Sequence, residues 1–165
     1  MEDGVLFTVM LVLHILAVIF WIGGLAFVTI LIFPSLYKMP EALQKVLFFQ
    51  RIEHRFAPLA RLYSAVVGIT GIVMVVHTGW YRLLFTGEGF FLTLMFLIWV
   101  MWTVMLFGLE PLVIKKMLDS MAKGEGKLDI DTVFKRMNVM HWVLLVLSMA
   151  AAASGVLFAH GPRFM

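Results

Sequence analysis

The chain has 165 residues, of which 62% are hydrophobic and 14% are charged, and it contains no cysteine. Soluble domains carry about 25% charged residues, so the composition predicts an integral membrane protein, and the length predicts a single domain over residues 1–165. The lack of cysteine excludes disulfides, iron–sulfur clusters and covalently attached c-type haem. The net charge of +3 is too small to indicate nucleic-acid binding.

Four apolar stretches are long enough to cross a bilayer, which takes about 20 residues of helix. They cover residues 5–33, 57–78, 90–114 and 137–160. We therefore predict an all-α integral membrane fold, a bundle of four transmembrane helices surrounded by the lipid bilayer.

The connection after the first stretch has a pattern of its own. Residues 39–56, MPEALQKVLFFQRIEHRF, place apolar residues at helical spacing behind Pro40. This pattern predicts an interfacial helix on the cytoplasmic face of the membrane, in the first cytoplasmic loop. The alternative is a plain N-terminal extension of the second span.

Basic residues are concentrated in two of the connections. Five lie in 34–61 and six lie in 115–136, whereas 79–89 contains only Arg82 and the C-terminal tail only Arg163. Loops rich in lysine and arginine stay on the cytoplasmic side of a membrane. We expect a multi-pass protein of the cytoplasmic membrane of a prokaryote, with both termini outside.

The two helical hairpins resemble each other. FQRI precedes the second span and FKRM precedes the fourth, and each span then has a serine, a glycine and a histidine in the same order. These residues are Ser64, Gly71 and His77 in one span and Ser148, Gly155 and His160 in the other. The pattern indicates a duplication with parallel repeats, for which chance similarity is the alternative. His14 has no counterpart, because the matching part of the third span, near Phe91 and Leu92, is apolar.

His14 lies in the outer half of the first span, within LHILAVIFWIGGLAF. Ionisable residues inside a span are costly and usually functional. Helical geometry places Ala17, Trp21 and Gly24 on the same face. A histidine beside small residues and an aromatic ring suits a planar macrocycle: the imidazole would bind iron, Ala17 and Gly24 would admit the edge of the ring system, and Trp21 would pack on it. The alternative is a histidine that hydrogen-bonds to a neighbouring helix.

His77 and His160 lie at the outer ends of the second and fourth spans. With His14 they place three imidazoles in the outer half, so His14 with His77, or with His160, would form the axial pair of a haem iron. The Cα atoms of His14 and His77 are expected to differ in depth by about 6 Å, which requires a tilt of the haem or of the helices. Interfacial polarity is the alternative for both outer residues.

His141 lies about one turn into the fourth span, on a face that continues with small residues. Such a stripe is more typical of a helix-packing seam than of a cofactor groove. A second haem site on the inner side, formed by His54 and His141, remains an alternative.

The stretch Leu13-His14, Ala17, Trp21 and Gly23-Gly24 resembles the first helix of the HemJ-type protoporphyrinogen oxidases and of the related CopD-type copper-resistance membrane domains. FFQRIEHRFAPL resembles the HemJ-type segment that enters the second helix, and FKRMN resembles the entry to the last helix. The resemblance implies a four-helix haem b protein with His14 as an axial ligand. The HemJ-type pattern also has a lysine at the start of the third helix, where this chain has Leu94, and this departure counts against a lysine-dependent oxidase.

The leading hypothesis is a membrane cytochrome b that exchanges electrons with a quinone or an external redox protein. The protein would set the haem potential through its axial ligands, burial and hydrogen bonds to the ligands, the last supplied by Tyr63, Ser64 or Thr70. The alternatives are a protoporphyrinogen oxidase, a copper-handling protein in which histidines and methionines carry Cu(I), and a purely structural subunit. The sequence is also compatible with a homo-oligomer.

Overall fold

The computed structural model describes residues 2–109 and 130–161, and this part of the chain contains helices and no strand. It forms α1 (Glu2–Phe27), α2 (Phe33–Tyr37), α3 (Ala42–His77), α4 (Phe90–Val104) and α6 (Ile130–His160). Four helical stretches, the first of them joining α1 to α2, are long and apolar enough to cross a membrane. The predicted fold class, an all-α bundle of four membrane-spanning helices, is confirmed. Residues 110–114 of the predicted third span and the basic residues of 115–127 lie outside the described residues.

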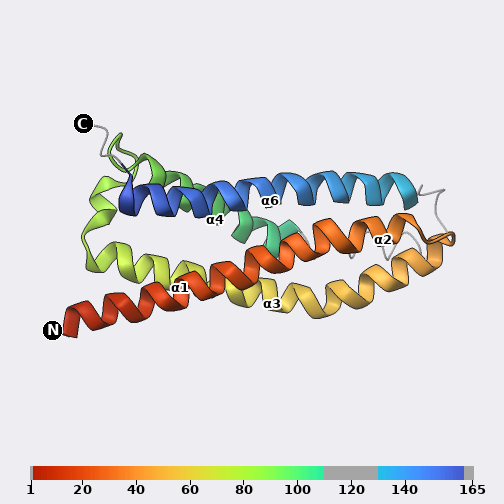
Figure 1. Cartoon of the computed structure of the whole chain (residues 1–165), viewed down its shortest axis with the longest axis horizontal. Helices are drawn as coiled ribbons and strands as arrows, with labels where there is room; N and C mark the ends of the chain where they lie inside the picture. Colours follow the sequence, from red (N-terminus) through yellow and green to blue (C-terminus); the bar gives the residue numbers. More distant parts are fainter. Residues whose placement is uncertain (1, 110–129, 162–165) are drawn as a thin grey trace.

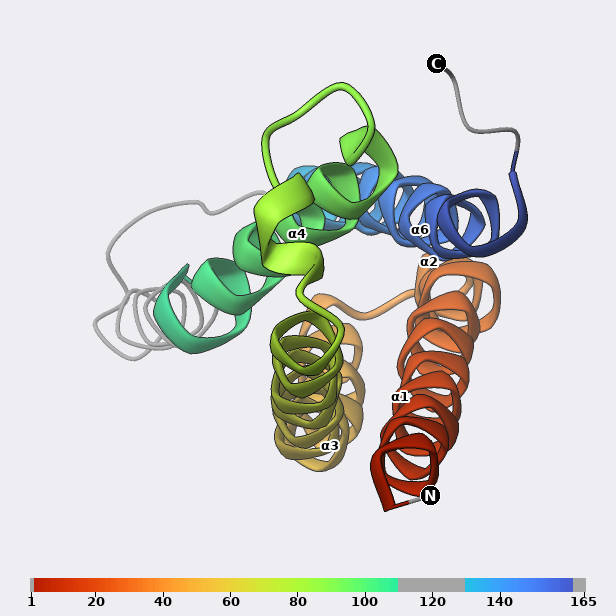
Figure 2. The same ribbon diagram turned by 90° about the vertical axis from the view of Figure 1, so that its left-hand side faces the viewer.

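The helices form two antiparallel hairpins. α1 packs along α3, and α4 packs along α6 (Figure 1). α1 also contacts α6, and α3 contacts α4, so α1 and α4 lie on one diagonal of the bundle and α3 and α6 on the other (Figure 2). Glu2 and His160 lie at the same end of the bundle, which we call the terminal end, whereas Tyr37 and Ile130 lie at the opposite end, the loop end.

Proline explains the irregular end of the first helix. Pro34 has no N–H to donate to the preceding turn and its ring crowds the carbonyl there. The residues before Pro34 form a π-helical turn at Val28–Ile32, in which the N–H of Phe33 bonds to the carbonyl oxygen of Val28. The helix then continues as α2 and ends at Tyr37.

Two helices extend further toward the loop end than the apolar stretches predict. The segment expected to be an interfacial helix is helical, but it is the first part of α3, which runs unbroken for 36 residues through Pro58. The alternative, an extension of the second span, is therefore the observed one. α6 likewise begins at Ile130, seven residues before the predicted start at 137.

Packing at the loop end explains both extensions. A compact apolar cluster joins α2, α3 and α6 there, and Phe33, Leu36, Val46, Phe49 and Phe134 are buried in it. Each helix carries its apolar stripe into this cluster, so the helical form is favoured by burial beyond the lipid-crossing part.

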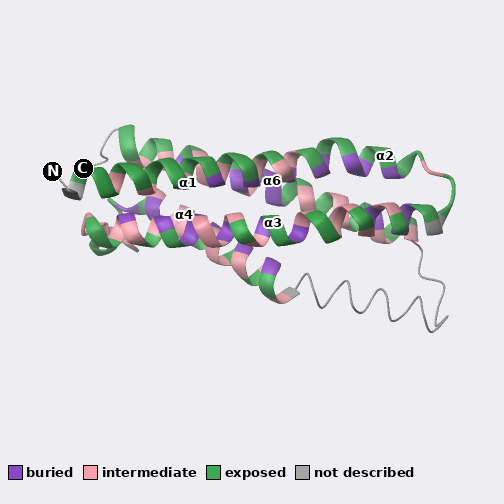
Figure 3. Cartoon of the chain, turned by 90° about the horizontal axis from the view of Figure 1, so that it is seen from below, coloured by how far each residue is buried: buried purple, intermediate pink, exposed green. Residues whose placement is uncertain are grey.

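Exposed residues lie all around the outside of the bundle (Figure 3), and many of them are large and apolar; we call these exposed apolar residues the belt. Beyond Pro58 they run from Leu59 to Val76 on α3, and on α6 they run from Val139 to Leu157. At a rise of about 1.5 Å per residue, these intervals are about 26 Å and about 27 Å long, close to the thickness of about 30 Å of a hydrocarbon core. The protein is therefore a multi-pass membrane protein whose belt faces lipid.

Candidate functional site

His14 is held by a hydrogen bond to the neighbouring helix. Its ring Nδ1 lies 2.9 Å from the hydroxyl oxygen of Thr70 on α3. The Thr70 hydroxyl donates its only proton to the carbonyl oxygen of Val66, at 2.6 Å, so the hydroxyl oxygen accepts from the histidine. With Nδ1 carrying the ring proton, both hydrogen bonds are made at once and Nε2 keeps its lone pair.

This hydrogen bond has the geometry that orients metal ligands. A ligating histidine usually donates its second ring N–H to a fixed acceptor, which sets the tautomer and the direction of the ring. Of the three groups that the sequence offered for this role, Thr70 is the one that contacts His14. The Ser64 hydroxyl is fully buried and has no hydrogen-bond partner within the described ranges.

A glycine lies against the ring. A Cβ atom at Gly71 would come 3.4 Å from Cε1 of His14, which is van der Waals contact. The imidazole thus lies against α3, beside the hydroxyl of Thr70 and a position without a side chain. Two consecutive residues of the partner helix therefore contact the ring.

The face of His14 points into the bundle, as the helical spacing predicts. Ala17 and Trp21 are buried, and the Trp21 ring packs edge-on against Trp102 of α4, with centroids 5.1 Å apart. Trp102 in turn donates its indole N–H to the hydroxyl of Ser148, at 2.9 Å. These aromatic rings and the serine fill the bundle interior on the loop side of His14.

The expectation that Gly24 admits the edge of a macrocycle is wrong. A Cβ at Gly24 would lie only 2.3 Å from Cε2 of Phe56, because the Phe56 ring already covers this glycine. Phe56 belongs to α3 and lies far from Gly24 in the sequence, so the sequence alone gave no signal of it.

A second aromatic layer lies at the terminal end. Trp80 contacts Phe7 of α1, with ring centroids 6.1 Å apart, and Phe158 of α6, at 4.9 Å. Phe7, His14 and Trp21 follow one another at intervals of seven residues, which return to nearly the same face of a helix. His14 therefore lies midway between two aromatic layers, about 10 Å from each along the axis.

His77 and His160 are exposed at the terminal ends of α3 and α6. His77 follows Thr70 by seven residues, so it lies about 10 Å further along α3 than the residue that contacts His14. This distance along the axis exceeds the depth difference of about 6 Å that the sequence predicts between the Cα atoms of His14 and His77. The structure thus does not bring His77 to the level of His14.

His141 lies near the loop end. Its Nδ1 is 2.8 Å from the carbonyl oxygen of Met137, and its ring packs edge-on against Phe33 at 4.8 Å. It precedes Ser148 by seven residues, so it lies about 10 Å to the loop side of the layer that contains Trp102, and about 21 Å from the level of His14. His54 is exposed on α3. His14 and His141 therefore do not share a site.

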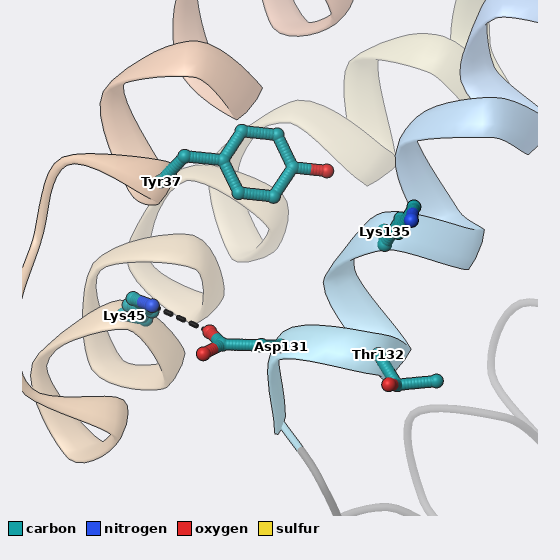
Figure 4. A pocket seen from close by; sticks show the side chains of 5 residues that line it. All are labelled: Tyr37, Lys45, Asp131, Thr132 and Lys135. Carbon is teal, nitrogen blue, oxygen red and sulfur yellow. Dashed lines mark hydrogen bonds and ion pairs between the residues drawn. The ribbon is translucent and has the colours of Figure 1, made fainter.

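A separate polar site links the helices at the loop end (Figure 4). Tyr37, Lys45, Asp131, Thr132 and Lys135 line a pocket of about 310 Å³. The Lys45 ammonium lies 2.5 Å from a carboxylate oxygen of Asp131, and the side chains are 9% and 71% exposed. This ion pair joins the start of α3 to the start of α6 and so connects the two hairpins.

Comparisons with known proteins identify no relative: no family model, no curated protein and no solved structure matches the chain. Among the described residues no three His, Cys, Asp or Glu side chains gather as a metal site would require. A haem iron needs only one or two axial side chains, and the tautomer of His14 fits that role.

Proposed function

We propose that the protein is a membrane haem b protein that transfers electrons near the outer side of the membrane, with Nε2 of His14 as an axial ligand of the iron. A bound haem would supply a one-electron redox couple. The partner would be a quinone or an external redox protein, in the cytoplasmic membrane of a prokaryote with both termini outside. This is the role that the resemblance to HemJ-type and CopD-type proteins implies for His14.

The hydrogen bond from Nδ1 of His14 to Thr70 is the observation that carries this proposal. A hydrogen bond to a neighbouring helix is also what the structural alternative for His14 predicts; a ligand needs, in addition, a free lone pair on the other ring nitrogen and a fixed direction. Thr70 provides both, because its own proton is already donated to Val66. The aromatic layers of Trp21 with Trp102 and of Phe7 with Trp80 would shield the iron from water.

The test is an optical spectrum of the protein purified from a haem-producing host, oxidised and then reduced with dithionite. A sharp α-band in the reduced protein supports haem b, and a pyridine haemochrome assay gives the stoichiometry. We expect His14→Ala to abolish the band. His54→Ala is the comparison variant: because His54 is exposed near the loop end, we expect its loss to leave a haem bound at His14 in place, whereas loss of haem in this variant would support the inner site.

Other outcomes redirect the assignment. Unchanged haem content in His14→Ala means that another residue holds the iron. A colourless protein that takes up Cu(I) supports the copper-handling alternative, and oxygen-dependent conversion of protoporphyrinogen supports the oxidase. Either activity would have to be lost in His14→Ala for it to depend on the same site.

A further inference from the structure

The connection between α3 and α4, residues 78–89, doubles back along α4; we call it the α3–α4 loop. The backbone N–H of Phe85 donates to the hydroxyl oxygen of Thr93, at 2.8 Å, and the Phe85 ring lies edge-on to the ring of Phe96, with centroids 6.4 Å apart. Both partners lie inside α4, which begins at Phe90. The loop therefore lies beside the first turns of α4, as Figure 2 shows, and not only beyond its end.

Two contacts set the register of α4 against the antiparallel α6. Trp102 donates its indole N–H to the hydroxyl of Ser148, and a Cβ at Gly155 would lie 3.3 Å from the sulfur of Met95. The two contacts are seven residues apart in each helix, so the helices stay in step along this interval.

This register places the tip of the α3–α4 loop within the belt. Continued by two residues in each helix, it brings Thr93 to the level of Leu157. Leu157 is the exposed apolar residue of α6 nearest to its terminal end. Because the backbone of Phe85 is bonded to Thr93, the tip lies at the edge of the belt, and its ring reaches further in, to Phe96.

The tip is apolar and exposed, and charged residues flank it. The Phe85 side chain is 69% exposed, the largest value for a large apolar side chain among the described residues. Phe90, at the start of α4, is exposed beside it. Arg82 precedes the tip and Glu88 follows it, and both are exposed. The apolar surface of the tip thus continues the belt that faces lipid, whereas the charges lie on either side of it.

The backbone at the tip is paired internally. Lipid offers no partner to an N–H group, so a loop can enter it only when its polar groups are satisfied by the protein. The N–H groups of Leu84 and Thr86 donate to carbonyl oxygens of the loop, and that of Phe85 donates to the Thr93 hydroxyl. The Thr86 hydroxyl donates to the carbonyl oxygen of Leu83, at 2.7 Å. These three N–H groups need no water.

The local conformation of the chain also holds the tip against α4. Phe85 has a φ of 63°, a left-handed conformation that is rare for a bulky residue and persists where the surroundings fix it. A Cβ at Gly89 would lie 2.0 Å from the carbonyl oxygen of Leu83, so the turn back toward α4 closes only with glycine at this position.

We propose that the α3–α4 loop is a re-entrant segment that inserts Phe85 among the acyl chains of the leaflet at the terminal end. Arg82 and Glu88 stay at the headgroups or in water. Lipid is the partner because the tip is continuous with the belt and lies at its level. This inference is independent of the haem proposal, since none of its residues contacts His14.

The experiment uses the fact that the chain has no cysteine. Phe85→Cys, Glu88→Cys and Ile69→Cys each receive one nitroxide label in vesicles of phosphatidylethanolamine and phosphatidylglycerol. Ile69 is 63% exposed in the belt and serves as the lipid reference. Power saturation compares collisions with oxygen, which concentrates in lipid, and with a water-soluble nickel chelate. We expect the label at 85 to behave like the label at 69, and the label at 88 to be several-fold more accessible to nickel.

The matched pair of labels separates depth from the nature of the label, because 85 and 88 carry the same nitroxide on exposed positions of one loop. A label at 85 that is as accessible to nickel as the label at 88 overturns the insertion. A label at 85 that is shielded from both oxygen and nickel overturns it as well, because a protein surface would then cover the tip.

A second substitution tests the part played by Thr93. In labelled Phe85→Cys, Thr93→Val leaves the N–H of residue 85 without its acceptor, so the label should become several-fold more accessible to nickel. Thr93→Ser keeps the hydroxyl and should keep the label in lipid. Equal accessibility in the two variants would overturn the assignment of Thr93 as the residue that holds the tip.

Discussion

The hairpin of α1 and α3 and the hairpin of α4 and α6 each place a side chain over a glycine of the partner helix, but they hold it differently. In the first hairpin the side chain is the imidazole of His14, fixed by Thr70 and lying on Gly71. In the second it is the thioether of Met95, in contact with Gly155. The first hairpin uses rigid rings elsewhere too, since Phe56 covers Gly24.

The difference follows from the chemistry of the two groups. An imidazole presents its lone pair in a single direction, so it has to be oriented by a partner such as Thr70. A methionine has three rotatable bonds and a polarisable sulfur, and it adapts to the space it is given. We infer that the first hairpin sets the geometry of the interior and that the second adjusts to it.

The largest expected effect is a loss of stability in the first hairpin. Gly24→Ala places a methyl group 2.3 Å from the Phe56 ring, and overpacking of this kind costs about 1–3 kcal/mol of stability. Gly23→Ala is the matched control, because nothing lies within 4 Å of a Cβ at Gly23. Thermal unfolding in detergent measures both. Equal stability of the two variants would contradict the close packing of Phe56.

A smaller effect is expected where the imidazole meets its acceptor. Thr70→Val keeps the shape of the side chain but removes the oxygen that accepts from Nδ1 of His14. Loss of such an orienting group lowers metal affinity by about tenfold or more, so haem titration of the apoprotein should show weaker binding in Thr70→Val. Thr70→Ser restores the hydroxyl and should restore the affinity; without that rescue, the defect would be one of packing.

The smallest expected effect is on stability in the second hairpin, formed by α4 and α6. Gly155→Ala brings a methyl group to 3.3 Å from the Met95 sulfur, and the flexible side chain can move aside. Replacing glycine by alanine inside a helix gains about 0.5–1 kcal/mol, so the stability in detergent should be unchanged or slightly higher. A loss as large as that of Gly24→Ala would show that the second hairpin is as rigid as the first.

The sequence predicted the helices well where hydrophobicity decided them and less well where packing did. The four spans were recognised because about 20 apolar residues are needed to cross lipid, whatever their neighbours are. The starts at 57 and 137 were too late, because the residues before them are only partly apolar. They are helical in α3 and α6 because they bury Val46, Phe49 and Phe134 in one cluster at the loop end.

The sequence likewise predicted some features of the candidate site and missed others that depend on packing. The sequence identified His14, since an ionisable residue among apolar ones is conspicuous and its helical neighbours Ala17 and Trp21 are fixed by the 3.6-residue period. It could not choose among Tyr63, Ser64 and Thr70, and it treated Gly24 as open space, because both questions depend on which faces of α1 and α3 meet.

The sequence by itself therefore determined the membrane-spanning class, the number of spans and the inward-facing stripe of the first helix, since these depend only on local composition and periodicity. Only the tertiary structure decided that Thr70 fixes the His14 tautomer, that Phe56 fills the space at Gly24, and that Met95 packs over Gly155. Those relations are set by how four helices pack side by side, and contacts between residues distant in the chain leave no periodic trace in it.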